Sequence, residues 1–304
     1  MTQFFANARR RHLAMLIATL ALSFAALMAP TPGAHSQDAN PDVSSAKKIV
    51  AIGGSVTEIV YALGEEKRLI ARDSTSMYPQ EAMALPDVGY MRALSPEGVL
   101  ATNPSAILAI EGSGPPDAMA VLKSAAVPMV VVPDTYTRDG ILAKIDAVGE
   151  ALHVEDKAKA LHDKVAADLD DAIAAAAKHP ENERKRVLFI LSLQNGKVMA
   201  SGSGTAADGI IHLAGLVNAA QGFPGYKALT DEAIIEAKPD AILMMERGGN
   251  HDATVKEITA HPALGLTPAA QNKAVIRMDG LHLLGFGPRT ASAVRDLTRA
   301  VYGE

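Results

Sequence analysis

Two segments of the chain, 135 residues apart, align without a gap. Residues 94–110 read LSPEGVLATNPSAILAI, and residues 229–245 read LTDEAIIEAKPDAILMM. A leucine, a glutamate, a proline and an Ala-Ile-Leu triplet occupy the same places in both. Each segment predicts a capped helix, a turn at the proline and a strand. A duplicated helix–turn–strand unit predicts two similar halves built on one plan.

Strand and helix patterns alternate in both halves. Apolar, β-branched runs predict the strands, and apolar residues at helical spacing predict the helices. Such alternation is typical of an α/β fold with a parallel sheet in each half. The predicted strands lie at 47–53, 69–72, 106–110, 129–132, 186–192 and 197–201, and the predicted helices at 57–63, 95–103, 116–125 and 208–214.

The segment between the halves predicts one long helix. Residues 151–180 contain no glycine before Pro180, which ends the helical pattern. Within them, 158–178 would span about 30 Å as a helix. We therefore expect an N-terminal lobe at 47–150, a connecting helix at 151–180 and a C-terminal lobe at 181–304.

The first 36 residues have the features of a secretory signal peptide. Three arginines at 9–11 precede an apolar run at 14–28 that is too short to span a membrane, and the run is followed by Ala34-His35-Ser36. We expect cleavage after Ser36, a flexible leader at 37–46 and a periplasmic protein.

Composition excludes several function classes. The 304 residues contain no cysteine, which excludes disulfides, thiolate metal sites, a thiol nucleophile and a lipid-modified cysteine. A net charge of −5 does not indicate a nucleic-acid-binding protein. The glycine-flanked serines Ser113 and Ser203 lack the outer spacing of a hydrolase elbow, and no Walker A or H-E-x-x-H motif occurs. We therefore expect a protein that is not an enzyme.

Two further motifs resemble a known family. An exported α/β protein with duplicated halves and one long connecting helix resembles the metal-chelate class of ABC-transporter substrate-binding proteins. Within that class, residues 72–104 (RDSTSMYPQEAMALPDVGYMRALSPEGVLATNP) and 283–290 (LLGFGPRT) are similar to the periplasmic haem-binding proteins of bacterial haem uptake. The resemblance implies two similar lobes with the ligand in the cleft between them.

The resemblance also implies a haem site. Tyr78, in a Ser/Thr-rich loop after a predicted strand, would be the axial ligand of ferric haem b, since a phenolate is a hard donor that suits ferric iron. In the family, an arginine of the C-terminal lobe faces this tyrosine, and Arg247 best matches that place. Arg72 and Arg92 are further candidates for contacting the haem propionates.

Glu97 and Glu232 hold the same position in the two repeats. The resemblance implies that they dock the protein on its membrane permease, although both could serve simply as acids in the first turn of a helix. The partners implied are haem, an inner-membrane ABC permease dimer and a TonB-dependent outer-membrane receptor upstream, with the binding protein itself a monomer.

A second ligand class stays open within the same architecture. A ferric-siderophore or corrinoid receptor would share the duplicated halves and the connecting helix. A zinc or manganese receptor fits less well, because it needs three or four clustered His, Asp or Glu ligands.

Overall fold

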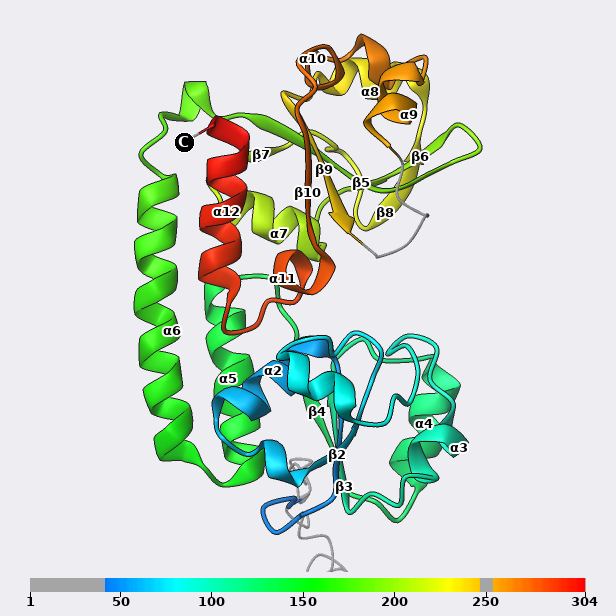
Figure 1. Ribbon diagram of the computed structural model, residues 1–304, viewed down its shortest axis with the longest axis vertical. Coiled ribbons are helices and arrows are strands. Elements are labelled where there is room, and N and C mark those ends of the chain that lie inside the picture. Colours follow the sequence, from blue (N-terminus) through cyan, green and yellow to red (C-terminus); the bar gives the residue numbers. More distant parts are fainter. Residues whose placement is uncertain (1–41, 247–253, 304) are drawn as a thin grey trace, which may run out of the picture. The chain divides into compact units, whose positions relative to one another are not determined.

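The first half of the chain forms a parallel sheet, as the sequence predicts. The computed structural model describes residues 42–246 and 254–303, and Figure 1 shows its elements. The strands β1 (Ile49–Ile52), β2 (Leu69–Arg72), β3 (Ala106–Ile110) and β4 (Met129–Val132) pair in parallel in the order β2-β1-β3-β4. Every residue of β1 and β3 is buried, which is why both read as unbroken apolar runs.

Short helices follow these strands. The first, α2, begins one residue after β1, past Gly53, and three residues earlier than its apolar pattern predicts. Gly64 beyond its end adopts φ +73°. The helical segments of this half are α2 (Gly54–Ala62), η1 (Glu66–Arg68), η2 (Gln80–Ala84), α3 (Pro96–Leu100) and α4 (Pro116–Ser124).

Two antiparallel helices lead into the second half. The helix α5 (Arg138–Leu152) ends at His153, which has left-handed backbone, and α6 (Glu155–Ala176) then runs without a break for 22 residues. Gly149 allows the two helices to approach closely, because a Cβ at that position would lie only 2.1 Å from the Cβ of Ala158. The helix α6 also packs along α12 (Thr290–Tyr302) (Figure 1). The region predicted as a connector therefore contains one continuous helix.

The second sheet is mixed, whereas the sequence analysis expected a parallel one. Its order is β10-β9-β5-β6-β8, with β7 also beside β5. The strands β10, β9, β5 and β7 are parallel, but β6 is antiparallel to both of its neighbours, β5 and β8. Asn195 and Gly196 explain the difference, because both have positive φ (51° and 70°) and close a two-residue hairpin between β5 and β6. The strands are β5 (Arg186–Gln194), β6 (Lys197–Ser201), β7 (Val217–Asn218), β8 (Tyr226–Leu229), β9 (Ala241–Glu246) and β10 (Val275–Asp279).

The remaining helices surround this sheet and complete the core. One large cluster of buried side chains includes all four strands of the first sheet, α5, α6 and α12, together with Phe189 and Leu243 of the second sheet. A smaller cluster covers the other face of the second sheet. The helical segments of this half are η3 (Glu181–Glu183), α7 (Ala206–Leu213), α8 (Asp231–Ala237), α9 (Val255–Ala260), η4 (Leu264–Leu266), α10 (Pro268–Gln271), α11 (Gly280–Leu284) and α12.

The duplicated sequence has the same backbone conformation in both copies. Ser95 caps α3 and Thr230 caps α8, each accepting a hydrogen bond from a backbone N–H three residues on. After each helix one residue has left-handed backbone, Asn103 at φ 54° and Lys238 at φ 42°, and the two are 135 residues apart.

The duplication extends to the attachment of each unit. The backbone N–H of Lys48 donates to the Ser105 hydroxyl at 3.1 Å, and that of Arg186 donates to the Asp240 carboxylate at 2.8 Å. Ser105 and Asp240 are equivalent positions of the repeat, and each lies beside the strand that opens its half. The predicted repeat is therefore confirmed by both conformation and hydrogen bonding.

Candidate functional site

A buried aspartate holds the loop that follows β2. Asp73 is fully buried. Its carboxylate accepts hydrogen bonds from the backbone N–H of Gly53 at 2.9 Å and of Thr75 at 3.0 Å, and from the hydroxyls of Thr75 and Ser76, each at 2.7 Å. Four donors on one buried carboxylate restrict the loop, because moving it would leave that charge without partners. The segment that leads to Tyr78 is thereby fixed against β1 and α2.

The next part of the loop exposes large apolar side chains. Tyr78 is 43% exposed, and Met77, Met83 and Tyr90 are exposed to a similar degree. Met91 lies instead in the hydrophobic core. Several exposed aromatic and methionine side chains in one short segment are typical of a binding surface, because soluble proteins usually bury such groups.

A guanidinium covers the ring of Tyr78. The Cζ atom of Arg289, which immediately precedes α12, lies 3.6 Å from the centroid of the ring. At this distance the cation is attracted to the electrons of the ring face. The phenol group thus has a fixed positive charge beside it.

Arg289 is held by a buried glutamate on α2. One oxygen of Glu58 accepts the Nη2–H of Arg289 and the other accepts its backbone N–H, each at 3.1 Å. The Glu58 side chain is 6% exposed. Burial raises the pKa of the Glu58 carboxyl, and the bonds from Arg289 offset only part of that rise.

A second buried charge fixes the same segment. Lys144 of α5 is fully buried and donates to Asp134 at 2.6 Å, to the Ser55 hydroxyl at 3.2 Å and to the carbonyl oxygen of Phe286 at 3.2 Å. Burial lowers the pKa of the Lys144 ammonium, while Asp134 acts in the opposite direction. Through these bonds the backbone from Phe286 to Arg289 is attached to the first half of the chain.

Arg92 bonds to one tyrosine and acts electrostatically on two others. Its Nη1 donates to the hydroxyl of Tyr90 at 3.4 Å. Burial raises the pKa of Tyr136 and of Tyr226, and the Arg92 charge lowers both in part, so it acts on the loop before α5 and on β8. Arg92 is therefore a cation that acts electrostatically on phenol groups from both halves of the chain.

Arg72, another candidate from the sequence, is buried at the end of β2. Its Nη1 donates to Asp87 at 2.7 Å and to the carbonyl oxygen of Asp73 at 3.1 Å. These bonds tie the two ends of the loop together. Arg247, the sequence candidate for the arginine facing Tyr78, lies outside the described residues.

Glu58 and Arg289 were not among the candidate residues that the sequence indicated. Arg289 lies within the 283–290 motif, but nothing in the motif says which residue the guanidinium contacts. The sequence around Glu58 is typical of an ordinary acid in a helix. Its burial depends on packing against the segment of Arg289, which is 231 residues away.

Glu97 and Glu232 are exposed on equivalent helices, as expected from the repeat. Each carboxylate lies beside its own backbone N–H and the hydroxyl of the capping residue, Ser95 or Thr230, and these bonds hold the pKa of each carboxyl below its usual value. The two acids are ionised and have the same local geometry. Their role in docking is not tested by these contacts and stays a prediction.

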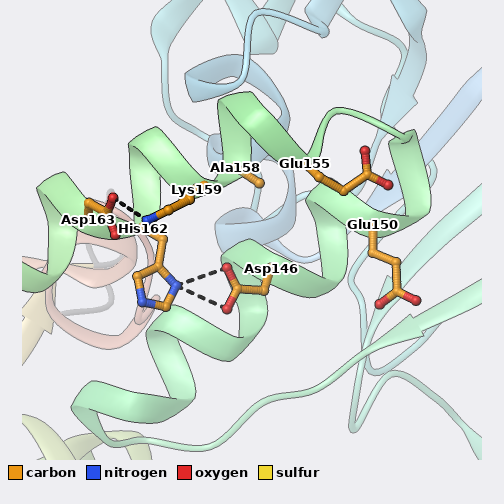
Figure 2. A pocket seen from close by; sticks show the side chains of 7 residues that line it. All are labelled: Asp146, Glu150, Glu155, Ala158, Lys159, His162 and Asp163. Carbon is orange, nitrogen blue, oxygen red and sulfur yellow. Dashed lines mark hydrogen bonds and ion pairs between the residues drawn. The ribbon is translucent and has the colours of Figure 1, made fainter.

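A separate groove lies between α5 and α6 (Figure 2). It has a volume of about 440 Å³ and is lined mainly by acidic side chains, with His162 and Lys159 among them. His162 Nδ1 bonds to both carboxylate oxygens of Asp146 at 2.9 and 3.0 Å, and Lys159 pairs with Asp163 at 2.6 Å. In the part of the chain that the structure describes, no three His, Cys, Asp or Glu side chains are grouped to hold a metal ion. Nor does any helix of residues 42–246 and 254–303 have the length and hydrophobicity needed to cross a membrane.

Comparison with known families and structures identifies the architecture. The family described as periplasmic binding protein matches residues 49–280. Among solved structures, the periplasmic haem-binding protein BhuT in complex with two haems is 38% identical, with a TM-score of 0.79 over 84% of this chain and 98% of that chain. The periplasmic haem-binding protein RhuT from Roseiflexus sp. RS-1 is 35% identical, with a TM-score of 0.80 and the same coverage.

Two curated proteins are also similar to this chain. An uncharacterised ABC transporter substrate-binding lipoprotein of Bacillus subtilis is 28% identical over 84% of this chain and 80% of its own length. A vitamin B12-binding protein of Pectobacterium carotovorum is 24% identical over 68% of this chain and 72% of its own length. The predicted fold class, two-lobed α/β, is confirmed by these similarities, and the proteins concerned are transport components and not enzymes.

Proposed function

We propose that this chain, which belongs to the periplasmic binding protein family, binds haem and delivers it to an ABC permease for haem and iron import. The coarser assignment, a periplasmic substrate-binding protein of an ABC transporter, rests on the family and on its relatives. The finer assignment, haem as the ligand, is supported by two similar haem-binding proteins at 38% and 35% identity over 84% of the chain.

The observation that carries the proposal is an exposed tyrosine with a cation on its ring. Tyr78 is 43% exposed on a loop fixed by Asp73, and Arg289 lies 3.6 Å from its ring centroid. Iron(III) prefers a phenolate ligand, and a nearby positive charge favours the ionised phenol. Tyr78 would therefore bind the iron of ferric haem b as its axial ligand.

The surroundings of Tyr78 suit the rest of the haem. Met77, Met83 and Tyr90 present apolar surface beside it, which matches a flat macrocycle. Arg92 is the better placed of the sequence candidates to meet a carboxylate of the propionates, because Arg72 is already paired with Asp87.

The proposal is tested by replacing Tyr78 with phenylalanine. This change keeps the ring under Arg289 and removes the oxygen donor, so the affinity for hemin should fall at least about tenfold, which corresponds to about 1.4 kcal/mol. The measurement is hemin titration followed by absorption, in which the phenolate-to-iron charge-transfer band should disappear.

Tyr90→Phe is the matched control, since Tyr90 is equally exposed and lies on the same loop. It should keep the charge-transfer band. An unchanged spectrum in Tyr78→Phe, or loss of the band in Tyr90→Phe instead, would refute Tyr78 as the ligand.

A corrinoid is the second candidate ligand, because a vitamin B12-binding protein is among the relatives. A corrinoid site does not need an anionic oxygen beside the metal. Parallel titrations with hemin and cyanocobalamin decide between the two. Tight cobalamin binding without a phenolate–iron band would assign the corrinoid function.

Export and domain organisation complete the proposal. We propose lobes at 47–150 and 181–304, with the segment 151–180 between them, and removal of the first 36 residues on export. N-terminal sequencing of protein isolated from the periplasm should begin at Gln37.

A further inference from the structure

We propose that Glu58 is a positioning residue: it holds the Arg289 guanidinium against the ring of Tyr78 and so sets how strongly that phenol binds ferric iron. This inference rests on the proposed function, in which Tyr78 is the haem ligand. It assigns a role to a buried acid that the haem itself would not contact.

The guanidinium has few other partners to hold it in place. Among the described residues, Glu58 accepts Nη2–H at 3.1 Å, His282 Nδ1 lies 3.4 Å from Nη1, and the buried Nε has no hydrogen-bond partner. His282 is itself bonded through Nε2 to Asp296 at 3.0 Å. The bond to Glu58 is the shorter one and joins two opposite charges, so Glu58 contributes most to the orientation of the guanidinium.

The burial of Glu58 makes this pair stronger than a surface ion pair. Its side chain is 6% exposed and that of Arg289 is 27% exposed. Charges removed from water interact more strongly because solvent screens them less. Moving Arg289 away would leave the buried Glu58 carboxylate without its partner. This energetic cost favours the position of the guanidinium over the Tyr78 ring.

The two carboxylate oxygens of Glu58 have different tasks. One accepts the backbone N–H of Arg289, while the other accepts the guanidinium. The backbone is also fixed by Lys144 at the carbonyl oxygen of Phe286. Gly287 lets this segment pass close to the acid, since a Cβ there would lie 3.4 Å from the Glu58 carboxylate. Glu58→Gln therefore keeps one oxygen for the backbone and removes the charge and the second acceptor.

The role of Glu58 has a spectroscopic signature. A positive charge on the ring face lowers the energy of the phenolate electrons more than that of the more distant iron. Transfer of an electron from phenolate to iron then needs more energy. Releasing the guanidinium from the ring should shift the charge-transfer band to longer wavelength, which simple loss of stability would not do.

The experiment compares four haem-loaded proteins: wild type, Glu58→Gln, Arg289→Met and the double variant. Both single variants should shift the charge-transfer band of the Tyr78–iron bond to longer wavelength. Each should also speed transfer of hemin to excess apomyoglobin by about tenfold, the scale of one charge-assisted hydrogen bond. The double variant should show no further shift, because the two residues act through one contact.

Glu65→Gln is the matched control. Glu65 is another partly buried acid of the first half, paired with Lys157 at 2.7 Å and with Arg68 at 3.4 Å, and neither partner contacts Tyr78. It should leave the band and the transfer rate unchanged. If Glu58→Gln does not fold, Glu58→Asp keeps the charge but is one methylene shorter and should shift the band in the same direction.

The outcomes separate this inference from the proposed function. If wild type does not bind hemin, the haem function itself is wrong. If it binds hemin without a phenolate–iron band, or if Tyr78→Phe retains the band, Tyr78 is not the ligand. If wild type has the band and Arg289→Met shifts it while the Glu58 variants do not, Glu58 is not a positioning residue. Additive shifts in the double variant, or tighter hemin binding in Glu58→Gln, would also overturn the inference, since Glu58 would then act only as a countercharge.

Discussion

At the scale of single residues, the candidate site depends on buried charges that are bonded to other parts of the chain. Asp73 fixes the loop before Tyr78, while Glu58 and Lys144 fix the segment that ends at Arg289. Each is buried, so each would be costly without its partners. The exposed ring of Tyr78 is thus held by hydrogen bonds and ion pairs beneath it.

The raised pKa of Glu58 predicts a specific response to acid. Because its pKa lies above the ordinary value of 4.5, the carboxyl takes up a proton at a higher pH than an exposed glutamate. Protonation removes the charge that holds Arg289. In haem-loaded wild type, the charge-transfer band should therefore shift to longer wavelength as the pH falls through the pKa of the Glu58 carboxyl. The shift should reverse when the pH is raised.

A control variant identifies the titrating group. Besides Arg289, the groups that act electrostatically with Glu58 are His282 on α11 and Lys144 on α5. In Glu58→Gln the step that belongs to Glu58 must be absent. The same acid transition in both proteins would contradict the assignment.

At the scale of elements, the contact between α5 and α6 depends on one glycine. A Cβ at Gly149 would lie 2.1 Å from that of Ala158, so Gly149→Ala should force the helices apart. We expect a loss of about 1–3 kcal/mol in the free energy of unfolding, measured by urea denaturation.

Gly98→Ala is the comparison for that prediction. Gly98 also lies in a helix, α3, but a Cβ there would meet Ser95 at an ordinary 3.6 Å. This substitution should be neutral or slightly stabilising, because alanine restricts the unfolded chain more than glycine does. Equal stability of both variants would show that the two helices can separate at little cost.

At the scale of the whole molecule, the duplicated halves carry exposed acids at equivalent positions. Glu97 and Glu232 are exposed and lie at the same place in each repeat. If they pair with basic sites on the permease, Glu97→Ala plus Glu232→Ala should bind hemin normally but lose transport in reconstituted vesicles. Such charges orient an encounter more than they strengthen it.

Asp117→Ala plus Glu236→Ala is the control pair for this prediction. Asp117 on α4 and Glu236 on α8 are exposed acids from the same two halves, but they are not equivalent positions of the repeat. They should leave transport intact. Normal haem-stimulated uptake in the Glu97 and Glu232 variant would leave both residues as ordinary helix-start acids.

The sequence by itself determined the local elements, because these depend on neighbouring residues. The strands at 69–72, 106–110, 129–132 and 197–201 have the predicted bounds, and the helix–turn–strand repeat has the same caps and left-handed turns in both copies. The Asn195-Gly196 dipeptide is also typical of an antiparallel hairpin. The alternation of strand and helix patterns alone was interpreted as a parallel sheet.

Only the tertiary structure decided which side chains meet. Glu58 and Arg289 are 231 residues apart, so neither residue's neighbours indicate that the two are bonded. The position of Arg289 on Tyr78 likewise depends on how α12 and α2 pack into one core. Local sequence governs backbone conformation over a few residues, whereas burial of apolar surface brings distant segments together and leaves their charges in contact.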